Sequence, residues 1–318
     1  MGAITTKGRK LHEIEHVPYE QAFLIGDLLT TNITMLAGEP KAGKTLLTAG
    51  MSVALLNGAD EFLGLPVLRP CRHIVFGLTD DGAEGELRER LHGAVPEDSV
   101  TVFPVEDTAQ TGYWQGVHDD LVALGADLFV LDNVLGALGD GEDVASSVTA
   151  RNTIDKLKPI SRSGIPVLAV THTPKGNGEG LTTASAPIGG RAMAGGVRGV
   201  IALRKSKKGR SIQTAINRAR EDLDLRVDVR PASESSEVPV WQRVESELKA
   251  VSLPTPKPWD EDLITRIIEE QPEEESALAL SKRYAPIVDR KPETVRPKLR
   301  DALERVDGRW VRRFADTA

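Results

Sequence analysis

The chain has 318 residues, of which 40% are hydrophobic and 27% charged, which is ordinary for a soluble globular protein with one large α/β domain and a small additional one. The formal net charge of -7 argues against a uniformly basic nucleic-acid-binding surface, although it is compatible with a local basic groove. A single cysteine, Cys71, excludes an intramolecular disulfide and a multi-cysteine metal site, which suits a reducing cytoplasm.

The first ten residues are basic and polar and lack the apolar core of a secretory signal. No stretch of the sequence approaches 18 continuous apolar residues, the length that a membrane span requires. We therefore expect a cytoplasmic protein with no membrane partner.

A glycine-rich segment lies between an apolar run at 33–37, which predicts a buried strand, and a helix-forming run at 46–56. This segment fits the phosphate-loop pattern G-x-x-x-x-G-K-[ST], and the order strand, loop, helix is the one that the pattern requires. Its residues are Gly38, Glu39, Pro40, Lys41, Ala42, Gly43, Lys44 and Thr45, with Leu46 following. We expect residues 38–46 to bind a nucleotide.

The chemistry of that loop explains its residue types. Gly38 and Gly43 allow a tight turn whose N–H groups point inward, and the helix that begins near Lys44 adds its positive end, so phosphate oxygens fit the nest. Lys44 is expected to reach the β and γ phosphates, and the Thr45 hydroxyl to join Mg²⁺.

Two later apolar runs end in carboxylates. Residues 71–78 predict a strand that ends at Asp80, where ligands bind in open α/β sheets. Asp80 is therefore a candidate functional acid, although it could instead cap the helix predicted from Ala83 to Leu91. Residues 126–133 predict a second such strand, whose Asp132 would hold the magnesium water shell together with Thr45.

Between these runs we expect a strand at 99–105 and then a polar loop to Gly125. A helix at about 144–161 and a strand at 165–170 follow, and the strand leads into His172. His172 lies across the sheet from the γ phosphate and is a candidate phosphate sensor, although a lone histidine is often structural.

The end of the core is predicted to contain strands at 200–203, 211–216 and 225–229. A basic turn from Arg204 to Arg210 separates the first two strands, and it could contact nucleic acid or simply be solvated. The expected organisation is a core at 1–230, a Pro/Ser/Glu-rich linker at 231–258 and a helical module at 259–318.

The module at 259–318 contains three predicted helices, 261–270, 278–284 and 292–305, followed by a hairpin at 306–311. This arrangement suggests a winged helix. From Ser276 onward the chain has eleven Lys and Arg against six Asp and Glu, opposite in sign to the whole protein. Duplex DNA is therefore one possible partner of the module, and another protein is the alternative.

Taken together, these motifs resemble the RecA-like ATPases over about residues 20–230, and within them the hexameric replication helicases of the RepA type found in plasmids and phages. The resemblance rests on the phosphate loop, on Thr79-Asp80-Asp81 and on Leu131-Asp132-Asn133. The acidic stretch 140–143, Thr171-His172 with Lys175, and the segment from Gly189 to Arg198 also match family features.

The resemblance implies an α/β, RecA-like core with a mostly parallel sheet flanked by helices, and ATP and Mg²⁺ as cofactors. It places Asp80 where the family usually has a catalytic glutamate, and His172 where it has the second of two histidines. It also implies that an arginine reaches the nucleotide of a neighbouring subunit. Arg198, Arg218 and Arg220 are the candidates here.

The function implied is ATP hydrolysis by a homo-hexameric ring that moves on single-stranded DNA as a replicative helicase. Three alternatives stay open: a filament-forming recombinase, a non-motor ATP-dependent DNA-binding regulator of replication, and, least favoured, a small-molecule kinase. Fold alone does not decide among them.

Overall fold

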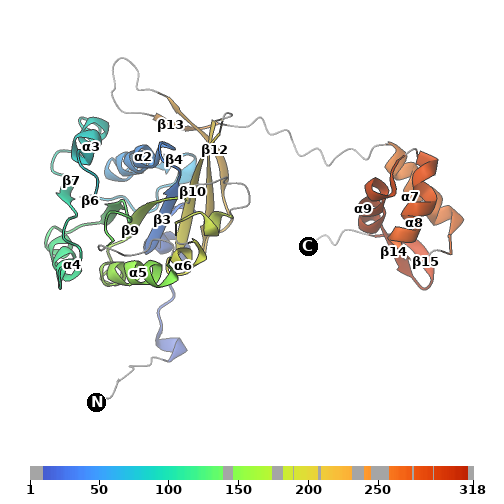
Figure 1. The fold of residues 1–318 in the computed structure, drawn as a ribbon, viewed down its shortest axis with the longest axis horizontal. Helices are drawn as coiled ribbons and strands as arrows, with labels where there is room; N and C mark the ends of the chain where they lie inside the picture. Colours follow the sequence, from blue (N-terminus) through green and yellow to red (C-terminus); the bar gives the residue numbers. More distant parts are fainter. Residues whose placement is uncertain are drawn as a thin grey trace. The chain divides into compact units, whose positions relative to one another are not determined.

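The computed structural model of the chain describes residues 10–138, 146–173, 182–188, 190–206, 209–230, 240–244, 258–273, 276–288 and 290–313. The chain divides into two compact units, Met1–Glu245 and Ser246–Ala318. Each unit has its own apolar core. Figure 1 shows the helices and strands of both units.

A nine-stranded sheet, counted over the described residues, forms the centre of the first unit. In spatial order its strands are β13 (Val240–Arg243), β12 (Asp224–Arg230), β11 (Gly209–Ile216), β10 (Gly199–Ser206), β3 (Ile33–Gly38), β9 (Val167–His172), β8 (Leu128–Asp132), β6 (Ile74–Leu78) and β7 (Val100–Pro104). The strands from β10 to β7 are parallel, whereas β11, β12 and β13 extend the sheet in antiparallel fashion. The predicted mostly parallel sheet is confirmed.

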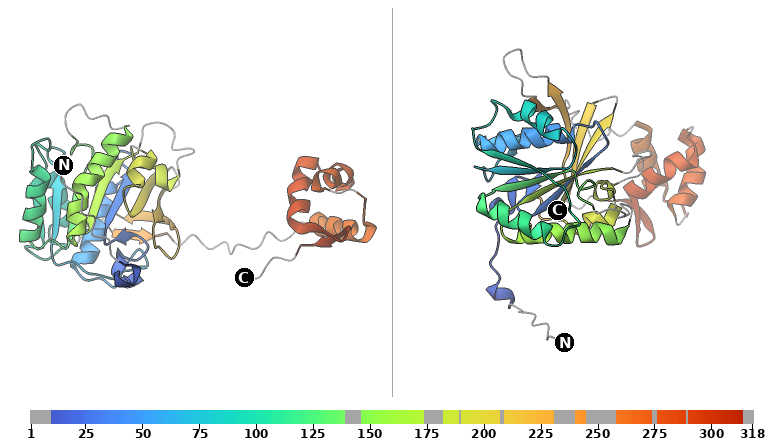
Figure 2. Two further views of the ribbon diagram at one scale, coloured as in Figure 1. Left: turned by 90° about the horizontal axis from the view of Figure 1, so that it is seen from below. Right: turned by 60° about the vertical axis from the view of Figure 1, so that its left-hand side comes forward.

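Helices cover both faces of this sheet (Figures 1 and 2). One face carries α2 (Lys44–Leu56) and α3 (Ala83–Leu91), and the other carries α4 (Tyr113–Ala123), α5 (Ser147–Arg162) and α6 (Gly190–Ala194). Side chains alternate between the two layers: in β8, Leu128 and Val130 join the core under α2, while Phe129 and Leu131 join the core under α5. Because strand side chains have a period of two, continuous apolar runs are needed to fill both cores.

Short elements surround this framework. They are η1 (Leu11–Glu13), α1 (Tyr19–Ala22), β1 (Phe23–Ile25), β2 (Leu29–Thr30), β4 (Glu61–Phe62), β5 (Leu65–Pro66) and η2 (Thr183–Ser185). None of the helices in the described part of the chain is long and apolar enough to cross a membrane.

The segment predicted as a loop up to Gly125 instead contains helix α4. Val117 and Leu121, one turn apart, are buried on one side of this helix, Tyr113 and Trp114 are partly buried against the same core, and Val122 is 52% exposed. Two buried positions in eleven residues make a weak periodic pattern, so packing against the sheet decides the helix.

The predicted linker at 231–258 contains strand β13, which pairs with β12. Its Trp241 is buried against α2, and its indole Nε1–H donates to the Leu46 carbonyl oxygen at 3.0 Å. The core unit therefore extends to this strand because one aromatic side chain finds a partner that is distant in sequence.

The basic residues predicted to lie in a turn are in fact largely on strands. β10 continues to Ser206 and β11 begins at Gly209, and the two strands form an antiparallel hairpin. Arg204 lies on β10 opposite Ser211, and Arg210 lies on β11 opposite Lys205. Residues 207–208 lie outside the described residues.

The second unit contains α7 (Pro258–Glu270), α8 (Ala277–Tyr284), η3 (Ala285–Val288), α9 (Pro292–Ala302), β14 (Leu303–Val306) and β15 (Arg309–Arg312). The three predicted helices and the hairpin are present, but α9 ends three residues before the predicted end at Arg305. Leu303 is buried as the first residue of β14, and its extended backbone ends the helix.

Candidate functional site

The phosphate loop joins β3 to α2 and is shaped by two glycines. Gly43 has a φ of 106°, a left-handed conformation that side chains disfavour. A Cβ atom on Gly38 would lie 2.8 Å from the Leu203 carbonyl oxygen, so only glycine fits there. The Lys44 ammonium folds back over the loop and donates to the carbonyl oxygens of Gly38 at 3.1 Å and Glu39 at 3.3 Å.

Thr45 and Asp132 meet at the mouth of this loop. Thr45 lies in the first turn of α2 and Asp132 ends β8, and the Thr45 hydroxyl donates to Asp132 Oδ2 at 3.0 Å. Burial raises the pKa of Asp132, against the opposing effects of the Thr45 hydrogen bond and the Lys44 charge. A hydroxyl and a carboxylate oxygen at this spacing are the hard ligands that Mg²⁺ prefers, so the pair fits that ion.

Asp80 lies beside these groups, just beyond β6, and Asn133 holds its carboxylate. The Asn133 side-chain amide donates to Asp80 Oδ1 at 3.1 Å and to Oδ2 at 3.3 Å. The Asn133 backbone N–H donates to the Thr79 hydroxyl at 2.9 Å, and Gly136 N–H donates to the Asn133 amide oxygen at 3.1 Å. These bonds fix which way the amide points.

The alternative role of Asp80 as a helix cap is not observed. The N-cap of α3 is Gly82, and no side chain caps it. Sequence reasoning included Asn133 in the motif Leu131-Asp132-Asn133 but gave it no role, although its position directly after the strand-end carboxylate could have indicated one.

His172 ends β9 and stands opposite Gly38 in the sheet register. Its Nδ1 lies 3.2 Å from the Lys44 ammonium. Burial and then the Lys44 charge lower the pKa of His172, while burial lowers the pKa of Lys44 against the opposing charges of Asp132 and Asp80. A neutral imidazole that accepts from Lys44 at Nδ1 carries its proton on Nε2, so His172 links the loop lysine to the end of β9.

The three candidate arginines lie at the amino-terminal ends of the parallel strands, away from the carboxyl ends where the phosphate loop lies. Arg198 N–H donates to the Ile33 carbonyl oxygen at the start of β3, and Asn217 N–H donates to the Arg198 carbonyl oxygen. The phosphate loop leaves the other end of β3, five residues further on, which is about 17 Å at the usual rise of a strand. None of the three arginines is therefore near its own chain's phosphate loop.

Two of these arginines bind the amino-terminal segment of their own chain. The Arg218 guanidinium donates to the Val17 carbonyl oxygen. Arg220 lies 3.9 Å from the centroid of the Tyr19 ring and 3.6 Å from the Glu20 carboxylate. Arg198 is exposed, and its side chain has no hydrogen bond or ion pair to the described residues.

An arginine that was predicted to be in a turn instead contacts the phosphate loop. Arg210, on β11, donates from Nε to the Ala42 carbonyl oxygen at 2.8 Å. Trp241 on β13 holds the first turn of α2 through the Leu46 carbonyl. No local pattern identifies these two contacts, because they join residues 168 and 195 positions apart.

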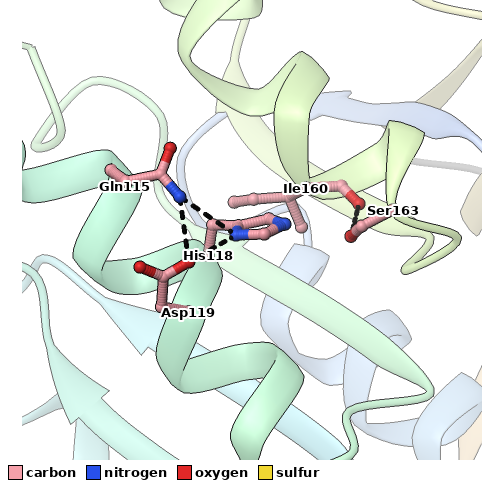
Figure 3. A network of polar contacts seen from close by, with 5 residues as sticks. All are labelled: Gln115, His118, Asp119, Ile160 and Ser163. Carbon is pink, nitrogen blue, oxygen red and sulfur yellow. Dashed lines mark hydrogen bonds and ion pairs between the residues drawn. The ribbon is translucent and has the colours of Figure 1, made fainter.

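A second group of polar side chains has Gln115, His118 and Asp119 on α4 and Ser163 at the C-cap of α5 (Figure 3). His118 Nδ1 contacts Asp119 Oδ1 at 2.9 Å and the Gln115 amide at 3.3 Å, whereas the Ser163 hydroxyl donates to the Ile160 carbonyl oxygen at 2.7 Å. A nucleophilic serine needs a hydrogen bond to its base. Since none joins Ser163 to His118, this cluster is not a hydrolase triad.

Asp140, Glu142, Asp143 and Lys175, which matched family features, lie outside the described residues. Comparison with curated proteins gives no match. Among solved structures, a KaiC-like protein from the hyperthermophilic archaeon Pyrococcus horikoshii OT3 is 16% identical, with a TM-score of 0.46 over 70% of this chain and 96% of that one.

A protein-family model described as an AAA domain matches residues 7–178. The matched region includes the phosphate loop, Asp80, Asp132 and His172, whereas Arg198, Arg210 and the second unit lie beyond it. Since the match covers more than half of the chain, this protein belongs to the AAA-domain family and has the phosphate-loop site of an ATPase.

Proposed function

We propose that this protein is a Mg²⁺-dependent ATP hydrolase that acts on DNA, as a ring-forming replicative helicase that moves on single-stranded DNA. The observation that supports ATP hydrolysis is the meeting of five side chains at one edge of the sheet. They are Lys44, Thr45, Asp80, Asp132 and His172, and three different strands and one helix bring them together.

Each side chain has a role in phosphoryl transfer to water, which depends on positioning and charge stabilisation. Lys44 would hold the β and γ phosphates. Thr45 and Asp132 would hold Mg²⁺, which would supply neutralisation of the phosphate charge when bound. Asp80 orients the attacking water, with its carboxylate fixed by Asn133. Loss of the γ phosphate changes the surroundings of Lys44, and its contact with His172 carries that change to the segment after β9.

The proposed assembly rests on where the arginines lie. Charge stabilisation by an arginine requires contact with the γ phosphate. Arg198 lies about 17 Å from its own phosphate loop, by the rise of a strand, and is exposed. A neighbouring subunit is therefore the partner that Arg198 would serve. Arg218 and Arg220 are less suited to this role, because they bind Val17, Tyr19 and Glu20 of their own chain.

A mixing experiment tests this assembly. Lys44→Ala removes the phosphate contact and Arg198→Ala removes the finger, so each variant alone should lose about 10³-fold or more in ATP turnover. A mixture should regain part of the activity, because a subunit with an intact phosphate loop then meets a neighbour with an intact Arg198. Arg72→Ala is the matched control, since Arg72 is 92% exposed before β6 at the same edge of the sheet.

The wider proposal is tested by ATP turnover with and without single-stranded DNA, beside the mass of the protein in ATP. A ring-forming helicase should be oligomeric, stimulated by DNA and able to separate a forked duplex. A monomer without stimulation would overturn the helicase. An oligomer that hydrolyses ATP without separating strands would instead support the non-motor regulator, and filaments seen by electron microscopy would support the recombinase.

A further inference from the structure

Charge is separated within the second unit. Residues 258–275 contain eight Asp and Glu and only one basic residue, Arg266, whereas eleven Lys and Arg against six Asp and Glu follow from Ser276 onward. The described members of the first group lie on α7 or just after it, and most described members of the second lie on α8, α9 and the β14–β15 hairpin. Only this second part of the unit has the charge that attracts phosphate.

A groove of about 520 Å³ between α8 and α9 collects three of these cations. Lys282 comes from α8, and Arg296 and Arg300, one helical turn apart, come from α9. All three side chains are exposed. Glu293 also lines the groove, and Arg300 makes an exposed ion pair with Asp301 at 3.0 Å. The groove is therefore strongly, although not purely, basic.

The core of the unit fixes the orientation of α9. Val295 and Leu299, one turn apart, are buried with Trp310 and Tyr284 in the core of the unit. Because these residues occupy one side of the helix, Arg296 and Arg300 are held on its outer surface. The Tyr284 hydroxyl, which donates to Glu270 at 2.6 Å, ties the end of α8 to α7. The cations thus stand on a rigid surface.

The hairpin adds another cation. Its turn places Asp307 and Gly308 at positive φ of 48° and 77°, which is a tight two-residue connection, and Arg309 follows it exposed. Duplex DNA has a major groove that admits one α-helix and a phosphate backbone on either side of it, so exposed cations on α9 and on a hairpin have the charge that such a partner requires.

The chemistry of the groove favours DNA over a protein partner. Its lining combines three cations and Glu293 with three apolar side chains, Leu278, which is 42% exposed, Pro292 and Pro297. Protein interfaces have an apolar centre, whereas protein–DNA interfaces are polar and strongly positive. We infer that the α8–α9 groove binds the phosphate backbone of duplex DNA through Lys282, Arg296 and Arg300, independently of ATP hydrolysis.

The test is the salt dependence of duplex binding by the full chain without nucleotide. A labelled blunt duplex of roughly 20 base pairs spans two helical turns. Binding should weaken steeply between about 50 and 200 mM salt, and each phosphate contact contributes about 0.9 to the slope of log K against log salt. The variant Lys282→Gln with Arg296→Gln and Arg300→Gln should lower that slope by about 2 to 3 and bind at least about 10-fold more weakly at the lower salt.

A matched control makes the same change of charge on the first unit, with Arg72→Gln, Arg151→Gln and Arg226→Gln, which are all exposed. It should bind like the wild type. Equal binding by the two triple variants, or no duplex binding at low salt, would overturn the inference. Tighter binding of an unlabelled single strand at the same site would do so as well. Basal ATP turnover of the wild-type chain is measured in the same samples to separate the two proposals. Absence of turnover would contradict the proposed ATP hydrolase, but it would not contradict DNA binding by the α8–α9 groove.

Discussion

At the scale of single residues, the carboxylate of Asp132, which we propose as a Mg²⁺ ligand, lowers the stability of the folded protein when it is charged. Its pKa is raised above the ordinary value of 3.8, chiefly by burial. The folded state therefore holds the proton more tightly than the unfolded state, so stability falls as the pH rises through the raised pKa and stays lower above it.

We predict that Asp132→Asn raises the melting temperature of the nucleotide-free protein at neutral pH, because the buried charge is removed. The gain should shrink as the pH falls toward 3.8, where the wild-type carboxyl is also neutral. The same variant should bind Mg²⁺ about 10- to 100-fold more weakly in the presence of nucleotide. Thermal scans at several pH values and a magnesium titration of ATP turnover measure both effects, and a lower melting temperature would contradict the first.

Asp80 should affect the chemical step and leave binding unchanged. Its carboxylate contacts the Asn133 amide and makes no hydrogen bond to the described residues of the phosphate loop. We expect Asp80→Asn to lower kcat by about 10²- to 10⁴-fold while the affinity for a fluorescent ADP analogue stays at the wild-type value. Loss of that affinity would show that Asp80 belongs to the binding site.

Arg210 should affect binding more than the chemical step. Its Nε–H donates to the Ala42 carbonyl within the phosphate loop, and a hydrogen bond from a charged donor contributes about 1.5 to 3 kcal/mol. Without this hydrogen bond the phosphate loop becomes ordered only when the nucleotide binds, and the cost of that ordering lowers the affinity. Arg210→Gln should therefore weaken ADP binding by about 10-fold, and it should raise KM more than it lowers kcat. Lys205→Gln, exposed on the same hairpin, should change neither.

At the scale of elements, α2 is packed so tightly that the usual effect of glycine in a helix is reversed. A Cβ on Gly50 would lie 2.7 Å from Trp241 Cδ1, whereas a Cβ on Gly85 in α3 would meet nothing within 4 Å. Alanine is favoured over glycine in a helix by about 1 kcal/mol.

We therefore expect Gly50→Ala to lower the melting temperature and Gly85→Ala to raise it, which differential scanning calorimetry can compare. The destabilisation by Gly50→Ala should be smaller when Trp241→Ala is already present, because the clash is then gone. Equal effects of the two alanines would mean that β13 does not pack on α2.

At the scale of the whole molecule, the two units have separate cores. Among the residues of the second unit that the structure describes, ten buried ones, including Tyr284 and Trp310, form its core. A unit of this size supplies about 3 to 5 kcal/mol of stability at most. Because the second unit has its own core, the fragment 246–318 should melt cooperatively when followed by circular dichroism. Its melting temperature should equal that of the corresponding transition of the full chain. A fragment without a cooperative transition would show that the second unit depends on the first.

The sequence by itself determined the ATP site, because the chemistry of that site is local. The spacing from Gly38 to Thr45 dictates the loop, and apolar runs that end in a polar side chain locate Asp80, Asp132 and His172. Parallel strands bring their carboxyl ends to one edge, so these residues meet without further information.

Only the tertiary structure decided at which end of the strands each arginine lies. Arg210 and Arg218 lie close in sequence, but β11 runs antiparallel to β10 and carries them to opposite edges. Strand direction and register are set by side chains that pack from distant segments, and a sequence window does not contain those segments. The same reason applies to α4 and β13, whose buried residues are too few to form a pattern until the sheet supplies a surface.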